Sequence, residues 1–227
     1  MTTAIRLQWE TTAAAGPLYR YLSAEFARSM VEDGRMRVTT LHACRASESG
    51  DARVDKDEGC FSAVDASEDV TVTTNDALPP FARRHLSVTE GRPTRLNGVV
   101  FQEDADSDDR FILCLSRTFS AELFEKFEVD ACVQILDPLL FFKRTTIALG
   151  YRVAGDATLF PIQYGRRTGR FQDVANIHPV WKKHPRYASE EEVRMLWTPT
   201  SRPIAPQLVT LTRCAESLRV LDRRDVG

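Results

Sequence analysis

The sequence lacks the patterns that mark several large classes of protein. No apolar run approaches the roughly 18–20 residues that a membrane-spanning helix needs, so we expect no contact with a membrane. The first residues, MTTAIRLQWETTAAAG, have no basic start followed by an apolar segment, and they predict no signal peptide. The five cysteines form no Cys-x-x-Cys pair and no Cys/His cluster with zinc spacing. We therefore expect a cytoplasmic, reduced protein without a metal ion.

Excess charge and nucleotide-binding motifs are also missing. The formal net charge is −2, which creates no overall attraction to nucleic acid or to an anionic membrane. The chain has no Gly-x-Gly-x-x-Gly after a strand, no Walker A motif and no Gly-x-Ser-x-Gly elbow. The four histidines stand alone, so we expect them in loops or on the surface. The acidic stretch 102–109 lacks the central glycine and terminal glutamate of an EF-hand and predicts a solvated hairpin tip.

The patterns that are present predict a mixed fold. A length of 227 residues suits one domain, and we expect a flexible segment over 1–16 followed by a single domain over 17–227. Alternation and β-formers predict strands over 17–22, 35–41, 95–101, 110–116, 130–137, 150–155 and 158–165. Capping residues and apolar spacing predict helices over 24–33, 121–127 and 139–149, and residues 208–221 fit either a helix or a strand. Because strands and helices do not alternate regularly, the class is α+β.

A block of carboxylates precedes a core-like strand near the C-terminal end, in YASEEEVRMLW (187–197). In an extended strand Glu190, Glu192 and Arg194 share one face, and Glu191 shares the other, core-facing side with Val193. Glu190 and Glu192 would then be separated by roughly 6.6 Å. Their mutual repulsion is tolerable in a water-filled cleft. Such a pair can stabilise an oxocarbenium-like transition state in glycosidic bond cleavage. The alternative is an acidic entrance to an edge strand that is exposed to water.

Three blocks of the chain carry a family resemblance. PLYRYLSAEFARSMVEDGRMRVTTL with ACRASE and DKDEG after it, FILCLSRTFSAELFEKFEVDACVQI, and HPRYASEEEVRMLWTP together extend over roughly 17–199. They resemble a group of bacterial proteins related to the DUF2971-type family, which has been placed among ADP-ribosyltransferase-like folds. The resemblance implies an α+β fold with an ADP-ribosyltransferase-like split β-sheet core, a few helices and long loops.

The resemblance also implies site residues. The late-strand catalytic glutamate falls on Glu192, with Glu190 as a second catalytic carboxylate that orients or deprotonates the acceptor. The middle-strand serine falls on Ser116. The first-strand residue that anchors NAD falls on Arg20, with Tyr21 as the alternative. We expect Glu191 to be solvated.

A further region is implied to line the same cleft. It contains Arg45 and the stretch from Asp55 to Gly59, with Asp57 or Glu58 as its acidic member. The basic, aromatic segment just before the carboxylates fits a contact with nucleic acid or with the NAD pyrophosphate, or else a solvated loop; it contains Trp181, Lys182, Lys183, His184 and Arg186.

The function that the resemblance implies is NAD-dependent ADP-ribosyl transfer to a protein or nucleic-acid acceptor. NAD is then a substrate, and the Glu-x-Glu pattern favours an arginine or nucleic-acid acceptor. A bacterial toxin, an effector or a phage-defence component is the expected setting, with an antitoxin or inhibitor protein as a candidate partner. The alternatives are an inactive binding module with the same fold, and an NAD glycohydrolase or another enzyme that cleaves glycosidic bonds.

Overall fold

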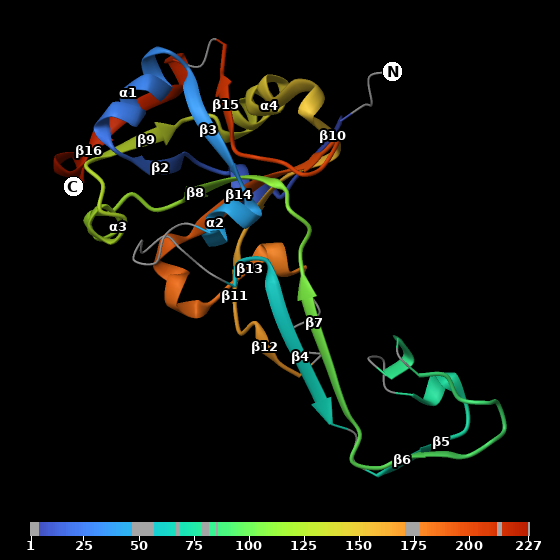
Figure 1. Ribbon diagram of the computed structural model, residues 1–227. Helices are drawn as coiled ribbons and strands as arrows, with labels where there is room; N and C mark the ends of the chain where they lie inside the picture. Colours follow the sequence, from blue (N-terminus) through green and yellow to red (C-terminus); the bar gives the residue numbers. More distant parts are fainter. Residues whose placement is uncertain are drawn as a thin grey trace.

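The computed structural model describes residues 5–46, 57–66, 69–78, 82–84, 86–170, 178–212 and 215–226. These residues form a mixed α+β structure with several sheets and few helices, which confirms the predicted class (Figure 1). No helix in the described ranges is long and apolar enough to cross a membrane.

The elements follow one another along the chain with short helical turns between them. The α-helices are α1 (Ala24–Glu32), α2 (Leu41–Ala46), α3 (Ala121–Lys126) and α4 (Pro138–Leu149). The strands of the main sheet are β1 (Ile5–Trp9), β2 (Leu18–Leu22), β3 (Arg35–Thr40), β8 (Phe111–Ser116), β9 (Ala131–Ile135), β10 (Val153–Pro161), β14 (Glu192–Pro199), β15 (Gln207–Thr210) and β16 (Leu218–Asp222). The strands of the smaller sheets are β4 (Cys60–Ala66), β5 (Val70–Val72), β6 (Thr94–Leu96), β7 (Val100–Asp106), β11 (Gln163–Tyr164), β12 (Thr168–Gly169) and β13 (Lys182–Lys183).

The main sheet has a layer of helices on each side. Its strand order is β1-β10-β14-β8-β2-β9-β16, and β3 pairs with both β8 and β15. Helices α1 and α4 cover one face, whereas α2 and α3 lie on the other (Figure 1). Strand alternation directs Val193, Met195 and Trp197 of β14 into the core beneath α1 and α4. The indole Nε1–H of Trp197 donates to Thr146 Oγ1 in α4 at 2.8 Å, which satisfies its one buried donor.

Local sequence signals account for the helix boundaries. Ser120 Oγ accepts from Leu123 N at the start of α3, and the Asp137 carboxylate accepts from Leu140 N at the start of α4. Gly34, after α1, has a φ of 68°, and a Cβ there would lie 2.2 Å from the Leu211 carbonyl oxygen. Only glycine therefore fits between α1 and β3.

The main sheet forks at β8, because two strands share one of its edges. β2 meets the C-terminal end of β8 at the rung Tyr19–Ser116, and β3 meets the N-terminal end at Ile112. The opposite edge of β8 pairs along its whole length with β14. Between β2 and β3 the sheet opens, and the candidate site lies at this opening.

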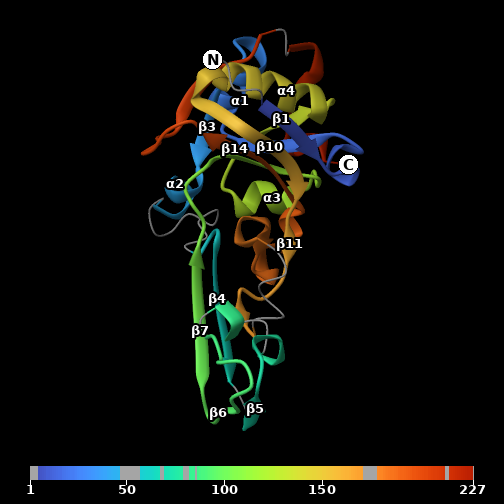
Figure 2. The same ribbon diagram turned by 90° about the vertical axis from the view of Figure 1, so that its right-hand side faces the viewer.

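A ribbon of two long strands, with the short β12 paired to one of them, projects from the main body beside the fork. β4 and β7 pair antiparallel over seven rungs, and β5 and β6 lie at the far end of the ribbon (Figures 1 and 2). A small apolar cluster of Val72, Leu78, Ala82, Val88 and Leu96 stabilises this tip. The prediction of a solvated hairpin tip over 102–109 is wrong, because residues up to Asp106 belong to β7, which pairs with β4 rather than with β8.

The chain differs from the sequence prediction in several other places. Within the expected flexible segment 1–16, residues Ile5–Trp9 form an ordered edge strand parallel to β10, and Ala13 is buried in the core. The two strands expected over 150–165 merge largely into β10, whose register shifts next to Gly155. Residues 208–221 contain parts of two strands, β15 and β16, rather than one element. Each difference depends on long-range pairing, which local pattern does not encode.

Candidate functional site

A cavity of about 410 Å³ fills the opening between β2 and β3, and we call it the fork cavity. Its volume lies within the range of small-molecule sites. The elements that supply its wall include β2 through Arg20, β3 through Thr39, β8 through Ser116, β13 through Lys183 and β14 through Glu192. The neighbouring Glu58, Glu190 and Tyr21 also line it. The cavity thus brings together residues that are up to 173 positions apart, from Tyr19 to Glu192.

Glu192 is the first residue of β14 and is only 4% exposed. Its Oε1 lies 2.5 Å from Arg194 Nε, and its Oε2 lies 2.8 Å from Lys183 Nζ. Its backbone N–H donates to the Tyr164 hydroxyl at 2.6 Å. Both carboxylate oxygens and the backbone are therefore fixed, so the orientation of Glu192 towards the cavity is rigid.

Glu190 reaches the same lysine from a different local structure. It ends the 3-10 turn Pro185–Glu190, and Glu191 between the two carboxylates has a left-handed backbone with a φ of 41°. The prediction that an extended strand places Glu190 and Glu192 on one face is therefore wrong at Glu190. The two carboxylates meet because Lys183 Nζ lies 2.6 Å from Glu190 Oε2 as well.

Glu191 does not face the core as strand parity predicted. It is exposed, and its Oε2 accepts from the Thr118 hydroxyl at 2.6 Å. The strand starts at Glu192, two residues later than the alternation assumed. The final expectation, that Glu191 is solvated, is confirmed by its exposure.

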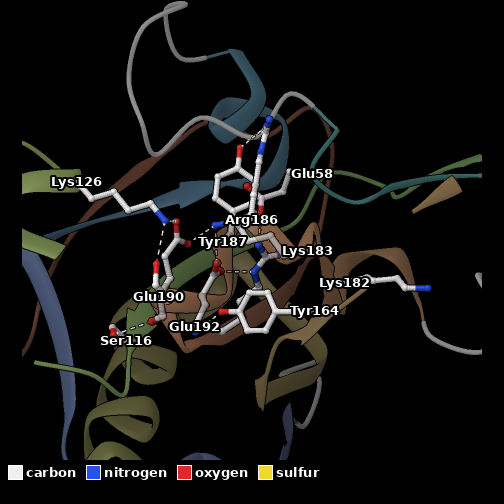
Figure 3. Close-up of polar contacts among 12 residues, drawn as sticks. Glu58, Ser116, Lys126, Tyr164, Lys182, Lys183, Arg186, Tyr187, Glu190 and Glu192 are labelled. Carbon is white, nitrogen blue, oxygen red and sulfur yellow. Dashed lines mark hydrogen bonds and ion pairs between the residues drawn. The ribbon is translucent and has the colours of Figure 1, made fainter. Parts of the chain in front are cut away.

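The two glutamates belong to a larger ion-pair chain that we call the carboxylate network. Its members alternate in charge along the order Lys126, Glu190, Lys183, Glu192, Arg194 and Glu58. Figure 3 shows Lys126 reaching Glu190 from outside, while Lys183 lies against both carboxylates. All members except Lys126 are at most 5% exposed. Buried charges are stable only when each has a partner, and here three cations match three anions.

The network controls the electrostatics of the fork cavity. Burial on its own lowers the pKa of Lys183, but the charges of Glu192 and Glu190 outweigh it and raise that pKa above the ordinary value. Burial and the charge of Glu192 raise the pKa of the Cys114 thiol. Burial likewise raises the pKa of Tyr164, which keeps the hydroxyl neutral as the acceptor of the Glu192 N–H. Lys183 is therefore a permanent cation between two carboxylates.

Ser116 and Tyr21 line the cavity, but their hydroxyls are engaged by the protein. Ser116 Oγ donates to the Glu190 carbonyl oxygen at 2.7 Å and accepts from Thr118 N at 2.9 Å. The Tyr21 hydroxyl donates to the Thr118 carbonyl oxygen at 2.9 Å and accepts from Ser120 N at 3.0 Å. Ser116 therefore anchors the turn that carries Glu190, and Tyr21 fixes the segment before α3.

The two candidate arginines differ in their position. Arg20 lines the fork cavity and donates from Nη2 to the Arg37 carbonyl oxygen at 3.1 Å, so it bridges the two strands that diverge at the fork. Arg45 is not among the residues that line the cavity. Its Nε donates to the Glu58 carbonyl oxygen, and its Nη2 lies 2.7 Å from Asp106 Oδ1. Arg45 thus positions Glu58, and Glu58 is the acidic residue of the 55–59 stretch that belongs to the carboxylate network. Asp57 is exposed, and Asp55 lies outside the described residues.

Sequence reasoning missed the central cations. The sequence predicts that Lys183 belongs to a basic segment that contacts phosphate or is solvated, yet Lys183 is 5% exposed and is neutralised by two glutamates. Lys182 is also buried, and in Figure 3 its side chain points away from the cluster. Tyr187 packs beneath the Lys183 and Arg186 side chains, with the cations 4.6 and 4.7 Å from the ring centroid. One argument could have predicted this role: two carboxylates that are buried together need a cation close by, and Lys183 is a lysine near them in the sequence.

Comparisons with known proteins do not identify this site. No protein-family model matches the chain, and no match was found among the curated proteins or the solved structures with which it was compared. Within the described ranges, no three His, Cys, Asp or Glu side chains gather in an arrangement that could bind a metal ion. The chemistry of the fork cavity therefore has to be inferred from its own residues.

Proposed function

We propose that this chain is an NAD-dependent ADP-ribosyltransferase with an ADP-ribosyltransferase-like fold, and that NAD binds in the fork cavity. The observation that carries the proposal is the rigid Glu192 carboxylate at the wall of the cavity, on the same rung as Ser116 and Tyr19 of the two adjoining strands. The acceptor is a protein or nucleic-acid nucleophile. This assignment agrees with the family resemblance of the sequence.

The proposed reaction breaks the bond between the nicotinamide nitrogen and C1′ of the ribose. The bonding electron pair leaves with nicotinamide, and positive charge develops on the ribose ring. A carboxylate that is already oriented stabilises this charge without reorganisation at the moment of reaction, and Glu192 provides it. The acceptor then forms the new bond to C1′, and its proton passes to water or to a nearby carboxylate. Glu190, which also lines the cavity, is the carboxylate that we assign to this step.

The remaining walls of the fork cavity suit the other parts of a dinucleotide. Tyr19 lines the cavity and stacks on Phe119 with ring centroids 5.4 Å apart, so this wall offers aromatic surface for a heteroaromatic ring. Arg20 and Arg37 line the cavity from the two diverging strands. Their guanidinium groups are the donors that bind phosphate oxygens best. In this proposal Tyr19 contacts a ring of NAD, Arg20 and Arg37 bind the diphosphate, and Glu192 faces the ribose.

One observation favours a second function, a binding module without transfer activity. Both oxygens of Glu192 already contact cations, namely Arg194 and Lys183. If Glu192 is catalytic, one of two conditions holds. Either its carboxylate stabilises the ribose while it keeps both cations, or its contact with one of the cations lengthens when NAD binds. In a binding module the network would only shape the cavity. The two functions differ in whether NAD is consumed.

The test is to incubate the purified chain with NAD labelled in its adenylate phosphate, with and without a bacterial lysate. Label on macromolecules supports ADP-ribosyl transfer, whereas free ADP-ribose alone supports a glycohydrolase. Unchanged NAD that binds in equilibrium dialysis supports the binding module. Absence of both turnover and binding contradicts the proposal.

Glu192→Gln is the decisive variant, and Glu191→Gln is its matched control on the adjacent residue. We expect Glu192→Gln to lower transfer at least about 100-fold, in line with the loss of a preorganised electrostatic group. Glu191 is exposed and does not line the cavity, so Glu191→Gln should keep wild-type activity. Circular dichroism verifies that both variants are folded. Equal activity of the two folded variants would remove Glu192 from the catalytic role.

A further inference from the structure

We infer that Lys183 is a positioning residue that fixes the catalytic carboxylate of Glu192 against the ribose of the bound substrate. This inference rests on the proposed function, and it assigns a role to a residue that the resemblance leaves without one. Lys183 is not expected to bond with the reacting atoms. It acts by bridging Glu190 and Glu192.

The bridge compensates for a repulsive arrangement. Glu190 and Glu192 are both 4% exposed, and their Oε2 atoms lie within 2.6 and 2.8 Å of the same ammonium nitrogen. Two carboxylates this close in a buried site repel each other strongly. Without the lysine, they would separate or share a proton, and either change would alter the negative charge that faces the cavity.

The short sheet of β11 and β13 holds both Lys183 and Glu192 in position. β13 pairs in parallel with β11, so that Lys183 lies beside Tyr164, and the hydroxyl of Tyr164 accepts the backbone N–H of Glu192. The Lys183 ammonium also lies 4.6 Å from the ring centroid of Tyr187. One two-stranded element thus fixes both the backbone and the side chain of Glu192. A support of this kind is what a preorganised catalytic group requires.

Lys182 provides a matched control on the same short strand. It is as buried as Lys183, with 4% and 5% exposed, respectively. It does not line the fork cavity, and Figure 3 shows its side chain directed away from the two carboxylates. Lys182→Met removes the same charge from the neighbouring position, and it leaves the bridge between the carboxylates in place.

The experiment measures steady-state NAD cleavage by the full chain and its Lys183 variants. For Lys183→Met we expect kcat to fall about 100-fold with KM changed less than about threefold, because misplacement by about 1 Å has an effect of this size. Lys183→Arg should recover most of the loss. Lys183→Ala should lose kcat to a similar extent, and added ethylamine should raise the kcat of Lys183→Ala at least about tenfold, because truncation at Cβ leaves space beside the cavity for a small ammonium ion. Lys182→Met should retain wild-type kcat and show no response to the amine.

The outcomes separate this inference from the proposed function. Wild-type kcat in folded Lys183→Met overturns the positioning role and leaves the proposed function standing. A loss of kcat that neither arginine nor ethylamine restores overturns it as well, because the lysine would then serve only the stability of the fold. A wild-type chain that cleaves no NAD overturns the proposed function and this inference with it. If Lys183→Met does not fold, Lys183→Gln takes its place with the same expectations, since its amide still donates hydrogen bonds.

Discussion

Removal of the Arg194 cation should destabilise this protein far more than removal of an exposed arginine. Arg194 is 0% exposed, and its contacts include three acceptors. Its Nε lies 2.5 Å from Glu192 Oε1, its Nη1 donates to the Val180 carbonyl oxygen at 2.6 Å, and its Nη2 pairs with Glu58. Arg194→Met therefore leaves two buried carboxylates without this cation. Breaking a buried ion pair from one side typically costs about 3–5 kcal/mol.

The magnitude can be measured by thermal unfolding and by urea unfolding, each followed by far-ultraviolet circular dichroism. For a chain of this length, each kcal/mol corresponds to roughly 2–4 °C in Tm, so we expect a decrease of roughly 6–20 °C. Arg6→Met is the control, because Arg6 donates two hydrogen bonds to Asp156, at 2.7 and 3.0 Å, from an exposed side chain. Water and salt screen that pair, and its loss should change the midpoint only slightly.

A double-mutant cycle shows whether the loss arises from unpaired buried charge. Adding Glu58→Gln to Arg194→Met removes one of the two uncompensated carboxylates, so part of the lost stability should return. The physical argument fails if Arg194→Met shifts the urea midpoint no more than Arg6→Met does. It also fails if the Glu58 and Arg194 substitutions are simply additive.

Two further predictions concern buried hydroxyls. Thr146→Val keeps the shape of the side chain but removes the acceptor of the fully buried Trp197 indole N–H. The free energy of unfolding measured in urea should therefore fall by about 1–3 kcal/mol. An unchanged urea midpoint would contradict a stabilising role of this hydrogen bond. Burial raises the pKa of Tyr21 from its ordinary value of 10.0 to about 12. The neutral phenol then contributes stability that is fully present below pH 10 and is lost as the pH rises towards about 12. The phenolate absorbance of the wild-type chain should show a tyrosine that titrates near pH 12, and this titration should be missing in Tyr21→Phe. If Tyr21→Phe still shows it, the raised pKa does not belong to Tyr21.

Much of the secondary structure could be predicted because its signals are local. The strand expected over 35–41 is β3 at Arg35–Thr40, and the helix expected over 121–127 is α3 with Ser120 as its cap. In each case, alternation or a capping residue acts over a few neighbouring positions. Such signals survive folding when the tertiary structure does not oppose them.

The candidate site could be predicted only in part. The sequence-based choice of Glu190, Glu192, Ser116, Arg20 and Tyr21 selected residues that all line one cavity, whereas Arg45 lies outside its wall. Their roles within that wall were not predictable. The positive φ of Glu191 takes Glu190 out of the strand, and that backbone conformation depends on contacts such as the one between Thr118 and Glu191.

The sequence by itself determined the α+β class, the local elements and the presence of a carboxylate pair next to a core strand. Only the tertiary structure decided that β2 and β3 diverge along one edge of β8, and that Lys183 lies between the two carboxylates. The physical reason is the range of the interactions. Capping and alternation depend on neighbours in the chain, whereas a buried charge is stable only beside the partner that folding brings to it. Glu192 pairs with Arg194, and Arg194 in turn pairs with Glu58, which lies 134 positions before Glu192 in the sequence.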